Sequence, residues 1–415
     1  MMQPSWSEMT HVFGRIGLMS FGGPAAQIAV MHRELVEDRP WLTEQTYLRA
    51  LSLCMLLPGP EAMQLATYAG WRLRGVWGGL LGGLLFVVPG ALVIAVLALL
   101  YAWYGQLPLV QTAFLGIKAA VIIVVLQALL KVARKALHGR LGWSLALASF
   151  VALFLFGLPF PLIILVAGAI GMVTGQAAPD GPDNTQLPPA QSLRTLLIWG
   201  TLWAAPLVVL ALMGDAFLLQ LGLFFSKLAV VTFGGAYAVL AYMTQTVVQD
   251  FGWINTDQMI DALGLAETTP GPLILVTQFV AMLAGFAQTG PTGAIVAGLL
   301  AVWVTFTPCF LWIFLAGPYL EMLSAQPRIS GALRAITAAV VGVIGNLSVW
   351  FALHVLFDRV GDSGLLALPA PDPASFNLSA ALLTAAAAVL MLGLKRGFVT
   401  TMSLTALLSF ALSAI

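Results

Sequence analysis

Residues 13–60 read FGRIGLMSFGGPAAQIAVMHRELVEDRPWLTEQTYLRALSLCMLLPGP, and residues 225–272 carry the same landmarks. Phe21-Gly22-Gly23, Trp41 and Pro58-Gly59-Pro60 return as Phe233-Gly234-Gly235, Trp253 and Pro270-Gly271-Pro272. The offset is 212 residues at each landmark (233 − 21, 253 − 41, 270 − 58), and an ungapped alignment gives 16 identities in 48 positions. We therefore predict a duplication, whose repeated unit carries glycine and proline where a continuous helix would not tolerate them.

The composition indicates a membrane protein. Of 415 residues, 60% are hydrophobic and only 8% are charged, which is unlike a soluble chain. Long apolar runs follow one another with short polar breaks, as in polytopic helical membrane proteins. The net charge of +1 says nothing about partners. The first ten residues lack the basic region and the cleavage site of a signal peptide, so none is predicted.

Thirteen hydrophobic segments can be counted, and they divide into six, one and six. The segments are roughly 12–31, 50–71, 76–104, 112–131, 141–157, 160–175, 195–214, 217–242, 262–285, 292–318, 334–357, 376–394 and 397–415. Gly70 and Gly75 match Gly285 and Gly290 at an offset of 215, and Pro89 matches Pro308 at 219. We predict an N-terminal repeat over 1–175, a linker and connecting helix over 176–216, and a C-terminal repeat over 217–415.

The basic residues predict the orientation in the membrane. With a cytoplasmic N-terminus and an external C-terminus, fourteen of the 18 Lys and Arg residues lie in inside loops and one, Arg359, lies outside. The fourteen are Arg33, Arg39, Arg49, Arg72, Arg74, Lys131, Arg134, Lys135, Arg140, Arg194, Arg328, Arg334, Lys395 and Arg396. Arg33, Arg39 and Arg49 correspond to Gln245, Phe251 and Asp261, so the second copy has lost these positive charges.

This loss of charge, with five crossings between the motif regions, predicts an inverted-topology duplication in an all-α polytopic membrane protein. Many secondary transporters use that arrangement to alternate access around a midplane site. The four motif segments either cross the membrane or form re-entrant pairs of broken helices. The charge distribution fits both, so this choice stays open.

The motifs place helix breaks inside apolar segments, and such breaks predict a ligand site. Unpaired N–H and C=O groups in a membrane persist only where protein or a water-filled cavity satisfies them. A half-helix that begins at Pro24 or Pro60 would direct N–H groups and a positive dipole end toward an anion. The predicted substrate-binding residues in the breaks are Gly22, Gly23, Pro24, Pro58, Gly59, Pro60, Gly234, Gly235, Pro270, Gly271 and Pro272.

Gly59 and Gly271 receive a specific prediction, because each lies between two prolines and keeps the N–H that the prolines lack. We expect that N–H, and open space beside it, to receive an oxyanion. The alternative for these glycines is that they only permit positive φ, and the alternative for the breaks in general is a tight kink that allows close helix packing.

Two cations occupy matching positions ahead of the breaks. Arg15 lies six residues before Phe21, and Lys227 lies six before Phe233. Charge inside a membrane is costly and marks function by default, so both are predicted to contact an anion, unless they extend to the membrane interface. Lys118, inside another apolar segment, is a further candidate.

Carboxylates and polar side chains complete the predicted site. Glu61 directly follows the first Pro-Gly-Pro and Glu267 precedes the second by three residues, so either is a candidate for proton coupling. Glu61 has a simpler alternative role, stabilising the N-terminus of a half-helix. Gln27, Gln64, Thr268 and Thr269, with Gln278 beyond them, are predicted to donate hydrogen bonds to an oxyanion.

Other functional classes find no support in the sequence. The four histidines and two cysteines suggest no metal geometry, and no cofactor is predicted. No phosphate-binding loop, catalytic triad spacing or nucleic-acid signature is present. We therefore predict a transporter and not an enzyme, with the lipid bilayer as its surroundings and no nucleic-acid partner. The sequence leaves a homodimer open.

The motifs resemble those of the chromate transporter family. The resemblance rests on Phe21-Gly22-Gly23-Pro24, Trp41 and Pro58-Gly59-Pro60-Glu61 in the first copy and on Glu267-Thr268-Thr269-Pro270-Gly271-Pro272 in the second. It covers nearly the whole chain, as in the long two-domain form. It implies export of chromate across the inner membrane, driven by the proton-motive force, with sulfate as the related oxyanion. Position 236 is Ala where the first copy has Pro24, which predicts an asymmetric site. The residues alone also leave open an anion channel or a membrane subunit without transport activity.

Overall fold

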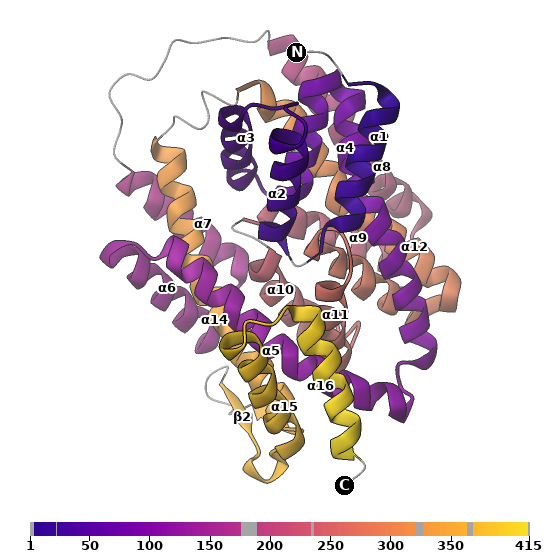
Figure 1. Cartoon of the computed structure of the whole chain (residues 1–415), viewed down its shortest axis with the longest axis vertical. Helices are drawn as coiled ribbons and strands as arrows, with labels where there is room; N and C mark the ends of the chain where they lie inside the picture. The colour runs from indigo at the N-terminus through magenta and orange to yellow at the C-terminus, as the bar shows by residue number, and fades with distance from the viewer. Residues whose placement is uncertain are drawn as a thin grey trace. The chain divides into compact units, whose positions relative to one another are not determined.

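The computed structural model is mostly helical and describes residues 4–21, 23–175, 189–233, 236–319, 327–362 and 368–413 (Figure 1). The helices of the first half are α1 (Trp6–Met19), α2 (Pro24–His32), the π-helix η1 (Arg33–Glu37), α3 (Glu44–Leu56), α4 (Glu61–Tyr104), α5 (Pro108–Ala136), α6 (Gly139–Phe154), α7 (Phe160–Thr174) and α8 (Pro189–Met213). Those of the second half are α9 (Ala216–Val231), α10 (Ala236–Thr244), η2 (Gln245–Asp250), α11 (Thr256–Thr268), η3 (Leu273–Leu275), α12 (Val276–Ala316), η4 (Gly317–Tyr319), α14 (Pro327–Leu356), η5 (Pro373–Ser375), α15 (Leu378–Ala388), η6 (Val389–Gly393) and α16 (Phe398–Ser413).

The chain forms two compact units, and each combines parts of both copies. Unit 1 comprises Met1–Leu99, Thr174–Ala236 and Thr269–Ser330, and unit 2 comprises Leu100–Val173, Tyr237–Thr268 and Gly331–Ile415. The predicted repeat boundaries therefore do not coincide with the compact units, because each unit takes segments from both copies and residues 237–268, early in the second copy, belong to unit 2. The boundaries themselves stay a prediction.

The four motif segments are interrupted where glycine and proline predict. In the first copy α1 ends at Met19 and α2 begins at Pro24, while α3 ends at Leu56 and α4 begins at Glu61. The second copy breaks at the same places, between α9 and α10 and between α11 and η3. Gly23 caps α2 with φ of 81°, a conformation that suits glycine, and Pro24 occupies the first helical position. The predicted start at Pro24 is confirmed, whereas the half-helix predicted to start at Pro60 begins one residue later, at Glu61.

In the first copy the chain folds back at the break. Arg15 of α1 and Glu34 of η1 are 19 residues apart (34 − 15), which in a straight helix would separate them by about 28 Å. Instead Arg15 Nε lies 3.4 Å from Glu34 Oε1. The rings of Phe13 and Trp41 also meet, with centroids 6.4 Å apart. The segment 12–31 is therefore a hairpin of two short helices.

A second turn recurs in both copies inside α4 and α12. Arg74 and Gly75 have φ of −143° and 64°, and Thr289 and Gly290 have −138° and 68°. The helix reverses at each turn, and the backbones touch at Gly70 against Gly78 and at Gly285 against Gly293. A Cβ would not fit at these contacts, so glycine is required there. The matched angles and contacts agree with the equivalence predicted at an offset of 215.

Unit 2 is organised around α5. Gly116 of α5 packs directly against the backbone at Thr405 of α16, and Ser409 Oγ donates to the carbonyl of Thr112 at 2.7 Å. Gly264 of α11 faces Ile117 and Val121 of α5. The unit also holds a short antiparallel pair of strands, β1 (Val360–Asp362) and β2 (Pro369–Pro371), a small exception to the all-α prediction.

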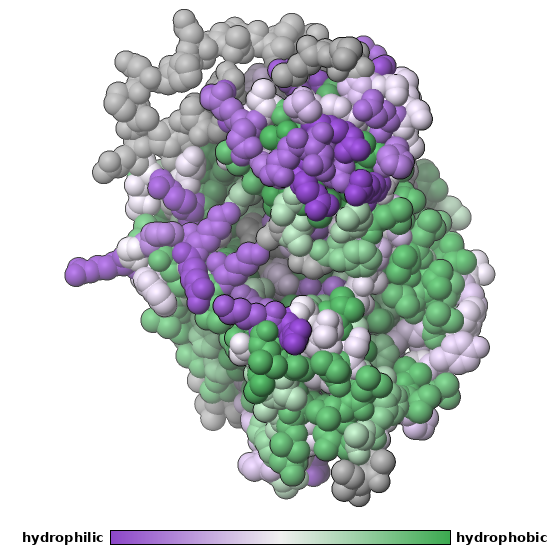
Figure 2. All heavy atoms as spheres, viewed as in Figure 1, coloured by the Kyte–Doolittle hydropathy of each residue, from purple (hydrophilic) through white to green (hydrophobic). Residues whose placement is uncertain are grey.

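The surface is that of a membrane protein. Among the described residues, five helices are long and apolar enough to cross a membrane by length and composition: Glu61–Tyr104, Pro108–Ala136, Ser192–Met213, Leu273–Tyr319 and Arg328–Leu356. Large apolar side chains lie exposed on the helices, for example Val173 at 86%. Figure 2 shows hydrophobic residues over much of the visible surface, with hydrophilic ones gathered near α1 and α2 and again along α5. The number of crossings and the inversion stay predictions.

Candidate functional site

The helix breaks of the two copies interlock inside unit 1 through reciprocal hydrogen bonds. The N–H of Gly59 donates to the carbonyl of Thr232 at 2.9 Å, and the N–H of Gly271 donates to the carbonyl of Ser20 at 2.9 Å. Gly271 and Thr232 are the equivalents of Gly59 and Ser20, because both pairs differ by 212 (271 − 59 and 232 − 20). Each Pro-Gly-Pro break is thus tied to the residue before the other copy's Phe-Gly-Gly motif.

Side-chain packing repeats the same exchange between copies. A Cβ on Gly59 would lie 2.9 Å from Cys309 Sγ of α12. A Cβ on Gly271 would lie 3.4 Å from the Cα of Gly90 in α4, and Gly90 in turn touches the carbonyl of Pro270. Gly90 and Cys309 follow the matched prolines Pro89 and Pro308. Each Pro-Gly-Pro break therefore rests on the proline-containing helix of the other copy.

These contacts correct one prediction. We expected the N–H groups of Gly59 and Gly271, and open space beside them, to receive an anion. Both N–H groups already have backbone acceptors, and the space beside Gly59 is filled by Cys309 and by Gln64, whose Nε2 would lie 2.9 Å from a Cβ there. The positive φ values of 119° and 89° give a sufficient reason for glycine at both positions.

The three glutamine amides donate to backbone carbonyls, two of them at the breaks and one inside α4. Gln27 Nε2 donates to Gly271 O at 2.8 Å and to Ser20 O at 3.4 Å. Gln64 Nε2 donates to Pro58 O at 2.7 Å, and Gln278 Nε2 donates to Ala91 O at 3.0 Å. All three side chains are buried. Gln27 and Gln64 thereby satisfy carbonyls of the irregular backbone at the breaks.

Sequence reasoning missed a row of polar groups on α12. Within the described residues, the Thr305 hydroxyl and the Trp312 indole N–H are buried donors without a hydrogen-bond partner. Cys309 lies between them and its thiol donates to Thr305 O at 3.4 Å. The spacing of i, i+4 and i+7 puts the three on one helix face, the face that Cys309 turns toward Gly59. That spacing around Pro308 was the available signal.

The two matched cations have different surroundings. Arg15 is 47% exposed and pairs with Glu34, a fully buried carboxylate that also accepts from Arg39 Nη1 at 2.7 Å. Arg15 thus has a carboxylate partner within the protein, and its predicted contact with substrate stays a prediction. Lys227 is exposed on α9. Its predicted contact with substrate stays a prediction.

The two carboxylates beside the breaks also differ. Glu61 is the first residue of α4. Its carboxylate there interacts favourably with the positive end of the helix dipole, in line with its simpler predicted role. Glu267, in unit 2, is buried and accepts a hydrogen bond from the Tyr237 hydroxyl at 2.5 Å. Thr268 donates to the carbonyl of Leu265 at 2.7 Å, so its hydroxyl is engaged within α11. Thr269 is buried in unit 1.

Of the predicted glycines, Gly22, Gly234 and Gly235 lie outside the described residues. Gly23 is described, and nothing lies within 4 Å of a Cβ built on it. In the first copy the Phe-Gly-Gly break therefore has open space at Gly23, whereas the Pro-Gly-Pro break is filled at Gly59.

Unit 2 contains a buried ionic cluster around Lys118, which the sequence marked only as a lone cation. Lys118 Nζ lies 2.6 Å from Asp257 Oδ1 and 3.5 Å from Asp261 Oδ1. The Tyr101 hydroxyl donates to Asp261 Oδ2 at 2.6 Å. The acidic partners stand one turn apart on α11, a spacing that could have indicated a shared cation.

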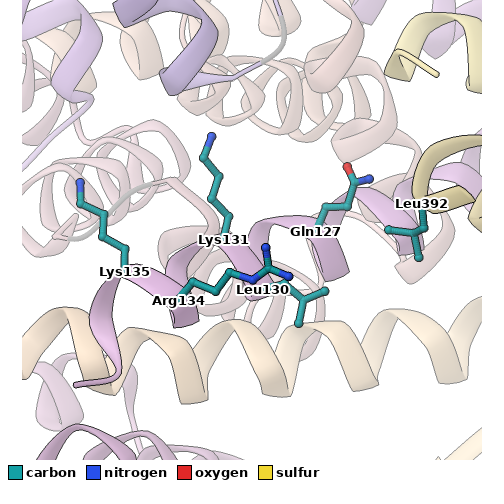
Figure 3. Close-up of a pocket in the computed structure, with 6 residues that line it drawn as sticks. All are labelled: Gln127, Leu130, Lys131, Arg134, Lys135 and Leu392. Atoms are coloured by element: carbon teal, nitrogen blue, oxygen red, sulfur yellow. The ribbon is translucent and has the colours of Figure 1, made fainter. Parts of the chain in front are cut away.

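A pocket of about 500 Å³ lies along α5, lined by Gln127, Leu130, Lys131, Arg134 and Lys135 and by Leu392 of η6. Figure 3 shows Gln127, Lys131 and Lys135 on one side of α5. Three cations and no acidic side chain line the pocket, so its field favours anions.

Comparisons with known proteins cover both copies. A family model described as chromate transporter matches residues 7–172 and 219–412. The two matched stretches begin 212 residues apart (219 − 7), the offset between the motifs.

Curated relatives are similar over most of their length. A probable chromate transport protein of Synechococcus elongatus is 32% identical over 355 residues, which cover 85% of this chain and 86% of the relative. A chromate transport protein of Cupriavidus metallidurans is 31% identical, covering 85% and 84%, and one of Pseudomonas aeruginosa is 31% identical, covering 86% and 83%. No solved structure matches the chain significantly.

Proposed function

The chain belongs to the chromate transporter family, and on that premise we propose that it is a secondary transporter that exports chromate across the inner membrane. The proton-motive force drives the transport, and access alternates around a site near the membrane midplane. Sulfate, a tetrahedral dianion of similar size, is the second candidate substrate.

The observation that carries this proposal is the reciprocal interlock of the breaks in unit 1. An unsatisfied backbone group inside an apolar unit costs several kcal/mol, on the order of 2 to 7, so irregular backbone persists there only where protein or a water-filled cavity satisfies it. Here two copies of the irregular backbone hold each other through Gly59, Thr232, Gly271 and Ser20. Such a rigid centre is suited to present donors from neighbouring helices.

The donors that we assign to the oxyanion are on α12. The Thr305 hydroxyl and the Trp312 indole N–H are buried without partners among the described residues, and an unsatisfied buried donor is itself costly. A tetrahedral oxyanion accepts several hydrogen bonds, so it would satisfy these groups when bound. Gly23, open on its Cβ side at the N-terminus of α2, is a separate candidate for contact with the anion.

Equivalent helices of the two copies belong to different compact units, and this difference supports alternating access. In the first copy α2 and α3 belong to unit 1, whereas their equivalents α10 and α11 belong to unit 2. Two copies of one motif thus occupy two different environments in one structure. In the alternate state the two helix pairs would exchange environments, as inverted repeats allow.

The pocket on α5 has a separate part in the proposal. The positive-inside distribution predicts that Lys131, Arg134 and Lys135 are cytoplasmic, and export begins on that side. Three cations around one pocket raise the local concentration of a dianion before it enters the transport path.

The test is transport by the purified chain in proteoliposomes. We expect uptake of radiolabelled chromate to rise when a proton gradient is imposed, and sulfate to compete more strongly than chloride. Counterflow, in which unlabelled substrate inside accelerates entry of label, is expected of a carrier and not of a channel. Chromate entry without counterflow would replace the carrier with a channel, and no chromate entry under any gradient would overturn the proposal.

Variants on α12 test the assigned donors. Thr305→Val keeps the shape and removes the hydroxyl, and Trp312→Phe removes the indole N–H. Each is expected to raise the chromate KM about tenfold, the effect of losing one good hydrogen bond to a charged ligand. Thr307→Val, two residues away and also buried, is the matched control. Unchanged KM in both donor variants would move the oxyanion away from α12.

A further inference from the structure

The cluster around Lys118 has the components of a switch between two ion pairs. Lys118 is on α5 and both carboxylates are on α11, so the cation joins two helices of unit 2. The side chain of Asp261 is fully buried, whereas that of Asp257 is 70% exposed. Lys118 therefore has one exposed acidic partner, Asp257, and one buried acidic partner, Asp261.

The hydrogen bonds within the cluster are unequal. Lys118 forms its short contact, 2.6 Å, with the exposed Asp257 and stands 3.5 Å from the enclosed Asp261. Asp261 Oδ2 accepts from the Tyr101 hydroxyl at 2.6 Å, but Asp261 Oδ1 is buried and accepts no hydrogen bond from the described residues. An enclosed carboxylate oxygen without a donor is costly when it is charged, and it is satisfied if it carries a proton or if the lysine moves onto it.

No other titratable group contacts Asp261 in the described part of unit 2. The neighbours are Lys118 from α5, Tyr101 at the end of α4 and Asp257 on α11 itself. The second buried carboxylate of α11, Glu267, is bonded to Tyr237 instead. A proton taken up in this cluster therefore has one place where it relieves an unsatisfied atom, which is Asp261 Oδ1.

We propose that Asp261 is the proton-binding site of the transporter, and that Lys118 alternates between Asp261 and Asp257 as the proton binds and leaves. Charge balances in both states. When Asp261 carries the proton, it is neutral and the Lys118 ammonium pairs with Asp257. When the proton leaves, Lys118 pairs with the Asp261 carboxylate, and Asp257 is left to solvent. This inference rests on the proposed proton-coupled function and names the residue that couples.

The cluster is a product of divergence between the copies. The equivalents of Asp257 and Asp261 in the first copy are Gln45 and Arg49, and the equivalent of Lys118 in the second is Thr337. A duplicated transporter needs only one such proton site.

The experiment compares Asp261→Asn with Asp257→Asn in proteoliposomes of the full chain. The two variants make the same chemical change one helical turn apart, against the same lysine. Chromate uptake driven by a proton gradient is measured beside chromate–chromate exchange at equal pH, and a pH dye inside the vesicles reports proton movement. Exchange moves no net protons, so it reports binding and folding independently of coupling.

We expect Asp261→Asn to lower gradient-driven uptake by about tenfold or more, to abolish the dye signal, and to leave exchange close to that of the unmodified chain. Asp257→Asn is expected to lower gradient-driven uptake by a smaller factor than Asp261→Asn, because Lys118 loses its partner in the protonated state but Asp261 can still bind the proton. Asp261→Glu, which restores a titratable carboxylate, is expected to recover part of the driven uptake.

Three results would overturn the inference. The first is gradient-driven uptake that survives in Asp261→Asn. The second is loss of exchange together with uptake in folded Asp261→Asn, which would make the cluster a structural link. The third is a larger loss in Asp257→Asn than in Asp261→Asn. If Asp261→Asn does not fold, the double variant with Lys118→Gln and Asp261→Asn is measured in the same way, because it removes both buried charges. If chromate uptake by the unmodified chain does not respond to the proton gradient, the proton coupling in the proposed function is refuted instead.

Discussion

The two copies share their backbone breaks but use their charges in opposite ways. In the first copy, buried Glu34 holds Arg15 and Arg39 and ties η1 to α1 inside unit 1. In the second copy the equivalent of Glu34 is Thr246, and the acidic residues stand on α11, where they bind Lys118 of α5 inside unit 2. The difference teaches that duplication determined where the helices break, whereas later substitution determined which neighbour each helix pair holds.

A further contrast concerns α5 and α14, the equivalent helices in the later part of each copy. Lys131, Arg134 and Lys135 line the pocket on α5, and their equivalents at an offset of 219 are Trp350, Leu353 and His354. The rings of Trp350 and His354 contact each other, with centroids 4.3 Å apart and planes tilted by 31°. One copy therefore presents an anion-attracting pocket where the other presents an aromatic pair.

Removal of the Glu34 charge is the strongest way to break this comparison. Glu34→Gln would leave two cations without their buried partner, so we expect the free energy of unfolding to fall by about 3 kcal/mol. Thermal unfolding in detergent measures this. Glu37→Gln, an exposed carboxylate in the same segment, is the control, and Thr246→Val is expected to have a small effect. Equal effects of Glu34→Gln and Thr246→Val would mean that both copies hold their helix pairs in the same way.

Alanine at the central glycines tests the shared part of the comparison. Gly59→Ala is expected to cost about 2 kcal/mol of stability, because φ is positive and the new Cβ meets Cys309 and Gln64. Gly271→Ala meets Leu275 at 3.1 Å and should cost less. Transport and the amount of folded protein should fall together in both.

A second change in α12 sharpens the result for Gly59. Cys309→Gly copies the glycine that faces Gly271, so it is expected to recover part of the stability lost in Gly59→Ala. Normal folding with abolished transport in Gly59→Ala would restore our original expectation that this glycine faces the substrate.

Gln27 links the copies in one direction only, because its equivalent is Val239. Gln27→Val leaves the carbonyl of Gly271 without that donor, and we expect a loss of about 1 kcal/mol. Exposed Gln45→Val on α3 is the control for the same chemical change. A stability loss no greater than that of the control would show that the reciprocal backbone bonds suffice.

The smallest expected effect concerns the pocket on α5. Lys131→Gln is expected to raise the chromate KM about threefold at low ionic strength and to have no effect at about 1 M salt, where charges are screened over a few ångströms. Transport kinetics at two salt concentrations measure this. Arg328→Gln on α14, outside the pocket, is the control. A KM change that persists at high salt would mean direct contact with substrate instead of attraction at a distance.

The sequence by itself determined the class of protein, the duplication and the positions of the breaks. These follow from local chemistry, because proline lacks an N–H, glycine accepts positive φ, and apolar runs of sufficient length favour a membrane. Pro24 at the start of α2 and the matched turns at Gly75 and Gly290 are direct results of those rules. The family resemblance also came from the motifs and is confirmed by the comparisons.

Only the tertiary structure decided what the breaks and charges contact. A sequence shows that Gly59 has an N–H, but not that Thr232, 173 residues away (232 − 59), accepts it. It shows Arg15 and Lys118 in apolar segments, but not that Glu34 and Asp261 lie beside them. Hydrogen bonds and ion pairs depend on distances of a few ångströms between residues far apart in the chain, and helical periodicity carries no information about them.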